Sequence, residues 1–408
     1  MSRSDGYLKF ILENLPYLAA GFLLMFISGL GQTYFVSIFS GEIREEFQLS
    51  DGDWGFLYMV GTGLSAIVMV FAGTLADRFR IRGLSAAVIA LLAVGCVLMS
   101  QITSVYALFA VIFCLRFAGQ GMASHLAVVA MSRWFIATRG RAIAIASLGF
   151  MIGEATMPLI MVWLKSFIDW RTLWIGFSFF ALAMIPILFV LLAKERQPSA
   201  MAQADESTGM QGRHWSRAEV IRTPLFWMLA PAVALLPAFG TAFWFHQVHF
   251  AEIKGWTHLA LVSVFPLSTI TLAFSTILYG WLIDKVGAVR LLPVYLAPVV
   301  FAFLLHGLST ETWTVGVAMI LMGLAGGGQA TVLSACWAEI YGTKHLGAIK
   351  SAIAALMVAG SAAGPWITGA LIDAGVSYES QLIWIAGIFA AAALFQFVPR
   401  NRILALTS

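Results

Sequence analysis

Residues 73–78 read Gly-Thr-Leu-Ala-Asp-Arg, and residues 280–285 read Gly-Trp-Leu-Ile-Asp-Lys. A glycine, a leucine, an aspartate and a basic residue recur in the same places, 207 positions apart. Four more positions keep that offset, since Gly121, Gly140, Gly153 and Pro158 recur as Gly328, Gly347, Gly360 and Pro365. Glycines, prolines and charged ends mark turns, caps and kinks. Eight such positions in one register predict that the chain is a duplicated unit.

The composition places both copies in a membrane. Of the 408 residues, 60% are hydrophobic and only 11% are charged, whereas a soluble domain carries roughly 25% charged residues. The apolar stretches are continuous runs and do not alternate between two faces, which excludes a transmembrane β-barrel. Helix is therefore the state that satisfies their backbone in lipid. We expect an all-α membrane protein with twelve spans near residues 15–40, 53–77, 83–103, 106–134, 138–164, 171–193, 224–253, 258–284, 288–308, 312–338, 343–371 and 378–400.

A polar segment divides the spans six and six. Residues 194–222 are rich in charged residues, serine, glutamine and glycine, and are expected to form a linker with a short surface helix near 215–221. The predicted domains are an N-terminal bundle over 1–193 and a C-terminal bundle over 223–408. Because six is an even number, both copies enter the membrane from the same side, as in a parallel repeat.

The basic residues predict the orientation of the chain. With both termini on one side, that side collects 19 of the 24 lysines and arginines. The other five are Arg44, Lys165, Arg171 and Lys254 on the far side and Arg116 within a span. The positive-inside rule then places the termini and the linker in the cytoplasm, in a cell membrane of the bacterial inner-membrane kind. The formal net charge of +4 is therefore explained by the orientation of the chain in the membrane, and no nucleic-acid partner is expected.

The paired loop motifs resemble the loop signature of the major facilitator superfamily of secondary transporters. Arg116-Phe-Ala-Gly119-Gln-Gly121 is similar to the fourth-helix motif of that superfamily, with its glycine and glutamine shifted by one residue. Arg80 stands where the first loop usually has glycine, whereas the second copy keeps Gly287. The resemblance covers the whole chain. It implies two pseudo-symmetric six-helix bundles that rock around a central site, with no enzyme activity and no cofactor.

The loop motifs also have a physical interpretation as a gate. The expected gating residues are Gly73, Asp77, Arg78, Gly280, Asp284 and Lys285. Spans 5 and 11 begin nearby, at Thr138 and Thr343, with unpaired N–H groups and a partial positive charge. We expect Asp77 to dock on the start of span 11 and Asp284 on the start of span 5, each contributing ~1 kcal/mol. The alternative is a solvated acidic residue in each loop.

Two charges lie deep within spans, where charge is expensive and marks function. Arg116 in span 4 and Glu154 in span 5 both fall about 15 Å from the expected outer ends of their helices. They could form an ion pair that clamps the spans together. Alternatively, Arg116 binds an anionic substrate while Glu154 carries the coupling proton. The equivalent positions in the second copy are Gly323 and Ser361, so the pair is specific to the first half.

In the superfamily that the chain resembles, spans 1, 4, 7 and 10 line the cavity. Their polar and aromatic members here are Gln32, Tyr34, Arg116, Gln120, Trp244, His246, Gln247, Gln329 and Trp337. One fixed cation, several amides and flat aromatic walls suit a small organic anion, although helix packing is the alternative role for each of them.

Histidines, cysteines and glycines receive structural interpretations. His246 and His249 share a helix face and could titrate near neutral pH, but without a further ligand nearby no metal site is expected. His125 lies on the face opposite Arg116 and is expected to be packed and hydrogen-bonded. The glycines of 149–153 and 360–364 allow close helix approach. Cys96, Cys114 and Cys336 are isolated in apolar runs and are expected to pack there.

These observations predict a secondary active transporter for a small organic solute, either a carboxylate or another organic anion. A proton or counter-solute gradient would drive it as a symporter or antiporter, and the protein would work as a monomer in membrane lipid. The segments 31–34 and 116–117 resemble those of bacterial monocarboxylate and oxalate/formate-type carriers. Efflux of drugs or hydrophobic solutes is an alternative. A non-transporting receptor would need a signalling domain, and Gly326-Gly-Gly328 precedes no phosphate-binding lysine.

Overall fold

The structure, a computed structural model, describes residues 9–136, 138–193 and 208–407, except the side chains of Asp77 and of 405–407. Within these residues the chain is helical and contains no strand. Among the described residues, ten helices are long and apolar enough to cross a membrane, or eleven if the bent pair Leu15–Gly31 and Thr33–Phe47 is one span. The ten are Asp51–Ala72, Ile81–Gln101, Val105–Trp134, Arg139–Lys165, Trp170–Leu191, Pro224–Phe245, His258–Val286, Thr312–Tyr341, Leu346–Asp373 and Tyr378–Leu404. The all-helical membrane fold is therefore confirmed.

Two of the expected spans differ from simple helices. The first consists of α2 (Leu15–Ile27), η1 (Ser28–Gly31), α3 (Thr33–Val36), η2 (Ser37–Phe39) and α4 (Ser40–Phe47), with a 49° bend at its break. Gln32 at the break has extended backbone angles (φ −85°, ψ 155°), so the continuous helix expected over 15–40 is wrong. The ninth span is shorter than expected, with α17 (Ala288–Leu291) followed by turns and α18 (Ala297–Leu308).

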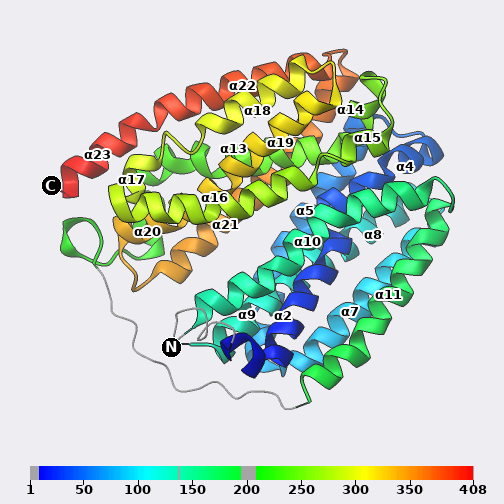
Figure 1. The fold of residues 1–408 in the computed structure, drawn as a ribbon, viewed down its shortest axis with the longest axis horizontal. Helices are drawn as coiled ribbons and strands as arrows, with labels where there is room; N and C mark the ends of the chain where they lie inside the picture. The colour runs from blue at the N-terminus through cyan, green and yellow to red at the C-terminus, as the bar shows by residue number, and fades with distance from the viewer. Residues whose placement is uncertain (1–8, 137, 194–207, 408) are drawn as a thin grey trace. The chain divides into compact units, whose positions relative to one another are not determined.

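The chain forms two compact units, of which the first comprises residues 1–47 and 60–203. In this unit α10 (Arg139–Lys165) packs on α2, and α11 (Trp170–Leu191) packs on α7 (Ile81–Gln101). Figure 1 shows α7 and α11 side by side. A Cβ atom at Gly149 would lie well inside van der Waals contact with the Phe22 carbonyl oxygen. The expected close approach of helices at Gly149 is thus confirmed.

The second unit comprises residues 48–59 and 204–408. Here α13 (Pro224–Phe245) packs on α21 (Leu346–Asp373), α16 (Pro266–Val286) on α19 (Thr312–Gly328), and α18 on α22 (Tyr378–Phe395). Gly360 and Gly364 bring α21 against α13, because added Cβ atoms would crowd the carbonyl oxygens of Ala234 and Ala238. The same kind of glycine contact therefore holds one helix pair in each unit.

The helix boundaries reproduce the repeat. Shifted by 207 positions, α10 covers 346–372, and α21 covers Leu346–Asp373. The same shift moves the span Val105–Trp134 onto 312–341, which is the span Thr312–Tyr341. In each half this span contains α-helix on both sides of a π-helical segment, named η3 (Arg116–Ala123) and η5 (Gln329–Leu333). The duplication read from single residues therefore extends to whole helices.

One helix crosses between the two units, and part of the predicted linker forms a short helix. Helix α5 (Asp51–Ala72) begins in the second unit and ends in the first, and the units otherwise divide between 203 and 204, within the segment expected to be the linker. The expected linker falls partly on residues 194–207, which lie outside the described residues. Beyond them, α12 (Arg217–Arg222) confirms the short helix expected near 215–221. Ser216 caps it and Glu219 bonds back to the Ser216 backbone, a reciprocal cap typical of helix starts.

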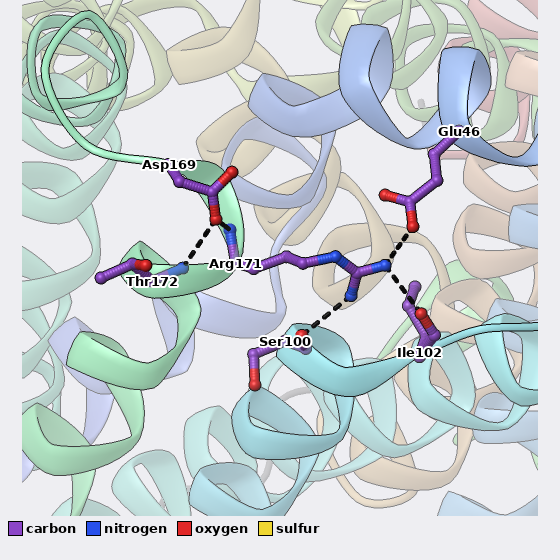
Figure 2. A network of polar contacts seen from close by, with 6 residues as sticks. All are labelled: Glu46, Ser100, Ile102, Asp169, Arg171 and Thr172. Atoms are coloured by element: carbon purple, nitrogen blue, oxygen red, sulfur yellow. Dashed lines mark hydrogen bonds and ion pairs between the residues drawn. The ribbon is translucent and has the colours of Figure 1, made fainter.

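Within the first unit, a polar network joins α4 to α11 and to the C-terminal end of α7 (Figure 2). Arg171 pairs with Glu46 and donates to the backbone carbonyls of Ser100 (2.8 Å) and Ile102 (2.7 Å). Asp169 accepts hydrogen bonds from the first backbone N–H groups of α11. A second tie lies close by in the sequence, where Lys165 pairs with Glu42 at 2.6 Å. Both of these basic residues thus have carboxylate partners.

Arg171→Ala is expected to lower the free energy of unfolding by ~1–3 kcal/mol, because two backbone carbonyls lose a charged donor. Thermal unfolding of the purified protein in detergent would measure this loss. Arg217→Ala, at an exposed position of α12, provides the matched control and should leave the transition unchanged. Equal effects of the two substitutions would contradict a specific role for the network.

Candidate functional site

Arg116 lies at the start of the π-helical segment η3 and is 1% exposed. Its Nη1 atom donates to the Gly31 carbonyl oxygen at 2.9 Å and contacts Thr33 Oγ1 at 3.5 Å, and its Nε atom donates to Thr62 Oγ1 at 3.1 Å. The guanidinium therefore lies at the break in the first span and binds the carbonyl group that directly precedes Gln32. Wide π turns occur often at functional sites.

The break and η3 approach each other through glycine. A Cβ atom at Gly119 would be 2.7 Å from Gly31 Cα, and one at Gly31 would overlap the Leu115 carbonyl oxygen. Only hydrogen at these two Cα atoms allows the backbones to come this close. The contact fixes where the Gly31 carbonyl points, so it positions the main acceptor of Arg116.

Tyr34, Glu154, Gln32 and Gln120 surround this break within the first unit. Tyr34 is 3% exposed, and a Cβ atom at Gly153 would lie 3.1 Å from its hydroxyl oxygen. Glu154, the next residue of α10, is half-buried and interacts electrostatically with Tyr34. Gln32 and Gln120 are also half-buried, on the break and on η3. The structure thus brings together the predicted site residues of this half. The ion pair between Arg116 and Glu154 stays a prediction.

The predicted residues of the second unit do not form one cluster. His246 follows the last residue of α13, whereas Trp337 packs on Phe226 near the start of that helix, with ring centres 5.9 Å apart. Twenty residues separate positions 226 and 246, or about 30 Å of helix. Trp244 packs edge-on against Phe265 at 4.5 Å. Trp337 and His246 therefore belong to opposite ends of the unit.

Two glutamines of the second unit have backbone partners. Gln329, on η5, is 9% exposed and donates to the Val233 carbonyl oxygen at 3.3 Å. Its Oε1 atom is buried without a hydrogen-bond partner in the structure. Gln247 is fully buried, donates to the Trp244 carbonyl oxygen and contacts His258 at 3.1 Å. A buried amide oxygen that lacks a donor makes Gln329 the better ligand candidate of the two.

All the predicted gating residues except the side chain of Asp77 lie within the described part of the chain. The Gly73 carbonyl contacts His125 Nε2 at 3.2 Å, and Arg133 donates to the Ala76 carbonyl oxygen at 2.5 Å. The side chain of Asp77 lies outside the described residues, while Arg78 is exposed. In the second copy Asp284 and Lys285 are exposed. Lys285 Nζ lies 4.0 Å from the centre of the Trp281 ring. A Cβ atom added at Gly280 would have no atom within 4 Å. The two docking contacts of the aspartates stay predictions, whereas the hydrogen-bonded role of His125 is confirmed.

Sequence reasoning missed several residues around Arg116 and His246. Thr62 and Thr33 contact the guanidinium, yet threonines within apolar runs give no distinctive signal. Asp51 lies beside His246 and His249, with carboxylate-to-Nδ1 distances of 3.5 and 3.4 Å. An acidic residue in the first turn of a helix is usually interpreted as a partner of the helix dipole. The sequence therefore does not indicate that Asp51 contacts two histidines. Among the described residues, no group of three or more histidine, cysteine or carboxylate side chains has the arrangement of a metal site.

Comparison with known proteins gives consistent results. The chain matches the family model described as Major Facilitator Superfamily over residues 21–306 and 263–405. It is 25% identical over 332 residues to the uncharacterized MFS-type transporter YhjX of Escherichia coli strain K12, and the match covers 78% of each chain. 

Solved structures share the fold over nearly the whole length. An inward-facing, unoccupied bacterial homolog of the human lysosomal transporter Spinster aligns with a TM-score of 0.70 and 18% identity, covering 96% of this chain and 97% of that one. The nucleoside transporter NupG aligns with a TM-score of 0.67 and 14% identity, covering 97% and 99%. At these identities the likeness concerns the fold.

Proposed function

Because the chain belongs to the major facilitator superfamily, we propose that this transporter moves a small organic anion, such as a carboxylate, across the cell membrane with coupling to protons. The proposal depends above all on one observation, the buried Arg116 held at the break of the first span. The protein itself is a multi-pass membrane transporter and not an enzyme.

The anion specificity follows from the groups around the break. The guanidinium of Arg116 carries a positive charge at this depth of the unit and donates to the oxygens of Gly31, Thr33 and Thr62. A carboxylate could replace one neutral acceptor and form a stronger, charge-assisted hydrogen bond. Gln32, Gln120 and Tyr34 would supply further donors from the same unit.

Glu154 is the proposed proton carrier. It is half-buried beside Tyr34, one residue from the glycine against which the Tyr34 hydroxyl lies. A carboxylate in a membrane span is costly while charged and less so once protonated. Proton uptake at Glu154 could therefore accompany arrival or release of an anion near Arg116. In the proposed orientation the termini and linker are cytoplasmic, following the excess of basic residues there.

The experiment that tests the substrate class is a thermal-shift screen of the purified transporter with organic anions, nucleosides, sugars, organic cations and hydrophobic drugs. A rise in melting temperature with carboxylates alone supports the proposal. Stabilisation by hydrophobic drugs and not by anions would favour the efflux alternative. Hits are then carried into proteoliposomes, where uptake of the radiolabelled compound must depend on an imposed gradient.

Glu154→Gln is expected to remove the response of transport to a pH gradient, because the amide mimics the protonated carboxyl and cannot release a proton. In proteoliposomes, a pH gradient should accelerate uptake by the wild type severalfold and leave uptake by the variant unchanged, while counterflow of substrate persists. Glu13→Gln, at an exposed position paired with Lys9, is the matched control. If a pH gradient still drove uptake by the Glu154→Gln variant, the coupling proton would be carried by another residue.

A further inference from the structure

Three titratable side chains meet where helix α5 begins, all within the second unit. The Asp51 carboxylate lies 3.5 Å from His246 Nδ1 and 3.4 Å from His249 Nδ1. The side chains are 6%, 1% and 17% exposed, respectively. His246 follows the end of α13, and His249 lies in the short helix α14 (Gln247–Ile253). One carboxylate thus bridges two imidazoles in a nearly dry environment.

The contact of the second nitrogen of His246 limits which of its nitrogens carries hydrogen. His246 Nε2 lies 3.0 Å from the carbonyl oxygen of Pro365. A carbonyl can only accept, so Nε2 carries the hydrogen in this contact. A neutral imidazole has one N–H, which leaves a lone pair on Nδ1 facing the Asp51 carboxylate. Both contacts are attractive only if a further proton lies between Nδ1 and the carboxylate, either on the imidazole or on Asp51.

The same segment of α5 packs tightly on α21. The Gly52 backbone N–H donates to Asp373 at 2.9 Å. A Cβ atom at Gly55 would be 2.8 Å from the Pro365 carbonyl oxygen. Trp54 stacks on Phe245, with ring centres 5.4 Å apart and planes 25° apart. The proton-dependent contacts therefore lie inside a larger docking surface for the start of α5.

Other ionisable groups surround the cluster from each neighbouring element. The ring of Tyr378 in α22 faces both histidines, at 5.7 and 5.8 Å between ring centres. Asp373 ends α21, Lys254 pairs with Glu379 at 3.5 Å, and Glu252 and His258 lie on the adjoining α14 and α15 (His258–Val262). Asp373 and Glu379 bind groups other than the histidines, whereas the Asp51 carboxylate lies beside both imidazoles.

We propose that Asp51, His246 and His249 form a proton-binding site that holds the start of α5 on α21 while the proton is bound. Loss of the proton leaves the Nδ1 lone pair of His246 against the charged carboxylate, so the contact turns repulsive and α5 is released. Docking is thus strongest at acidic pH and weakens as the pH rises and the bound proton is lost. Because α5 continues into the other unit, such a release would act on a helix that both units share. This site is separate from Glu154 and does not depend on the substrate proposed above.

Hydrogen–deuterium exchange of the full-length protein in nanodiscs tests the proposal without any substrate. Peptides covering 51–59 are followed from pH 5.5 to 8.5, with labelling times scaled to the intrinsic exchange rate. The wild type should lose at least ~10-fold protection in this segment as the pH rises, equivalent to 1.4 kcal/mol. Peptides covering 346–359, on the part of α21 away from the cluster, report whether each variant remains folded.

The variants separate the site from general pH effects. His246→Gln with His249→Gln, and separately Asp51→Asn, should make protection of 51–59 independent of pH. His345→Gln, which removes an exposed histidine at the other end of α21, should retain the wild-type response. A wild-type pH response in the double histidine variant overturns the proposal, as does constant protection of 51–59 in the wild type. Glu154→Gln should keep the response, so failure of the proposed coupling role leaves this result unaffected.

Discussion

Arg116→Ala is expected to abolish stabilisation by organic anions and to lower their transport by at least ~100-fold. The substitution removes the buried positive charge at the break of the first span and a charge-assisted hydrogen bond to the anion, which together correspond to about 2–3 kcal/mol of anion binding. It also leaves the buried Gly31 carbonyl and Thr62 hydroxyl without their donor. Melting temperatures with and without anion measure binding, and proteoliposome uptake measures transport.

Two further variants separate these effects. Arg116→Lys keeps the charge but has no forked donor to reach both Gly31 and Thr62, so it should retain part of the anion response with reduced stability. Arg171→Ala also removes an arginine bonded to backbone carbonyls of the same unit, away from the break. It should lower stability while preserving the anion-induced shift. An undiminished anion shift in Arg116→Ala would mean that the anion binds elsewhere.

Gly364→Ala is expected to cost ~3 kcal/mol of stability, near the upper end of typical overpacking effects. The new methyl group would overlap the Ala238 carbonyl oxygen, a backbone atom that no side-chain rotation can move away. Helices α13 and α21 would have to separate along their contact. A decrease in melting temperature of several degrees in detergent, together with slower transport in proteoliposomes, would record this change.

The two halves of the molecule provide the comparison for this experiment. Gly149→Ala crowds the Phe22 carbonyl between α2 and α10, so it should have a similar cost. Gly387→Ala, in α22, meets no atom within 4 Å and should be neutral or stabilising by up to ~1 kcal/mol, since alanine favours helix over glycine. If the Gly364→Ala and Gly387→Ala variants had the same melting temperature, the close approach of α13 and α21 would not limit stability.

The helical fold could be predicted because its determinants are local. Long apolar runs specify spans, and glycines, prolines and charges mark their ends, so α10 and α21 begin within a few residues of the expected positions. The break at Gln32 was missed because it depends on a distant partner. Ser28-Gly-Leu-Gly31 permits a bend, but the bend is stabilised by packing of Gly31 on Gly119 and by the hydrogen bond from Arg116.

The candidate site was predictable only where charge is rare. Arg116 and Glu154 stand out within apolar runs, since burial of a charge needs a reason. Their surroundings depend on backbone carbonyls and on threonines, which no sequence pattern distinguishes. Trp337 and His246 illustrate the opposite limit: both lie on spans assigned to one cavity, yet depth along the helices separates them. Assignment of a residue to a span therefore predicts its depth only approximately.

The wide turns in the fourth and tenth spans bear on how the molecule arose. Ser124 donates to the Gln120 carbonyl beside η3, and Thr331 donates to the Gly327 carbonyl beside η5 at 2.7 Å. Both pairs are related by the 207-residue offset. The most economical history places this turn and its hydroxyl donor in a six-helix ancestor, before the gene was duplicated. Arg116 corresponds to Gly323, so the two copies share the turn and its hydroxyl donor but differ in charge at this position.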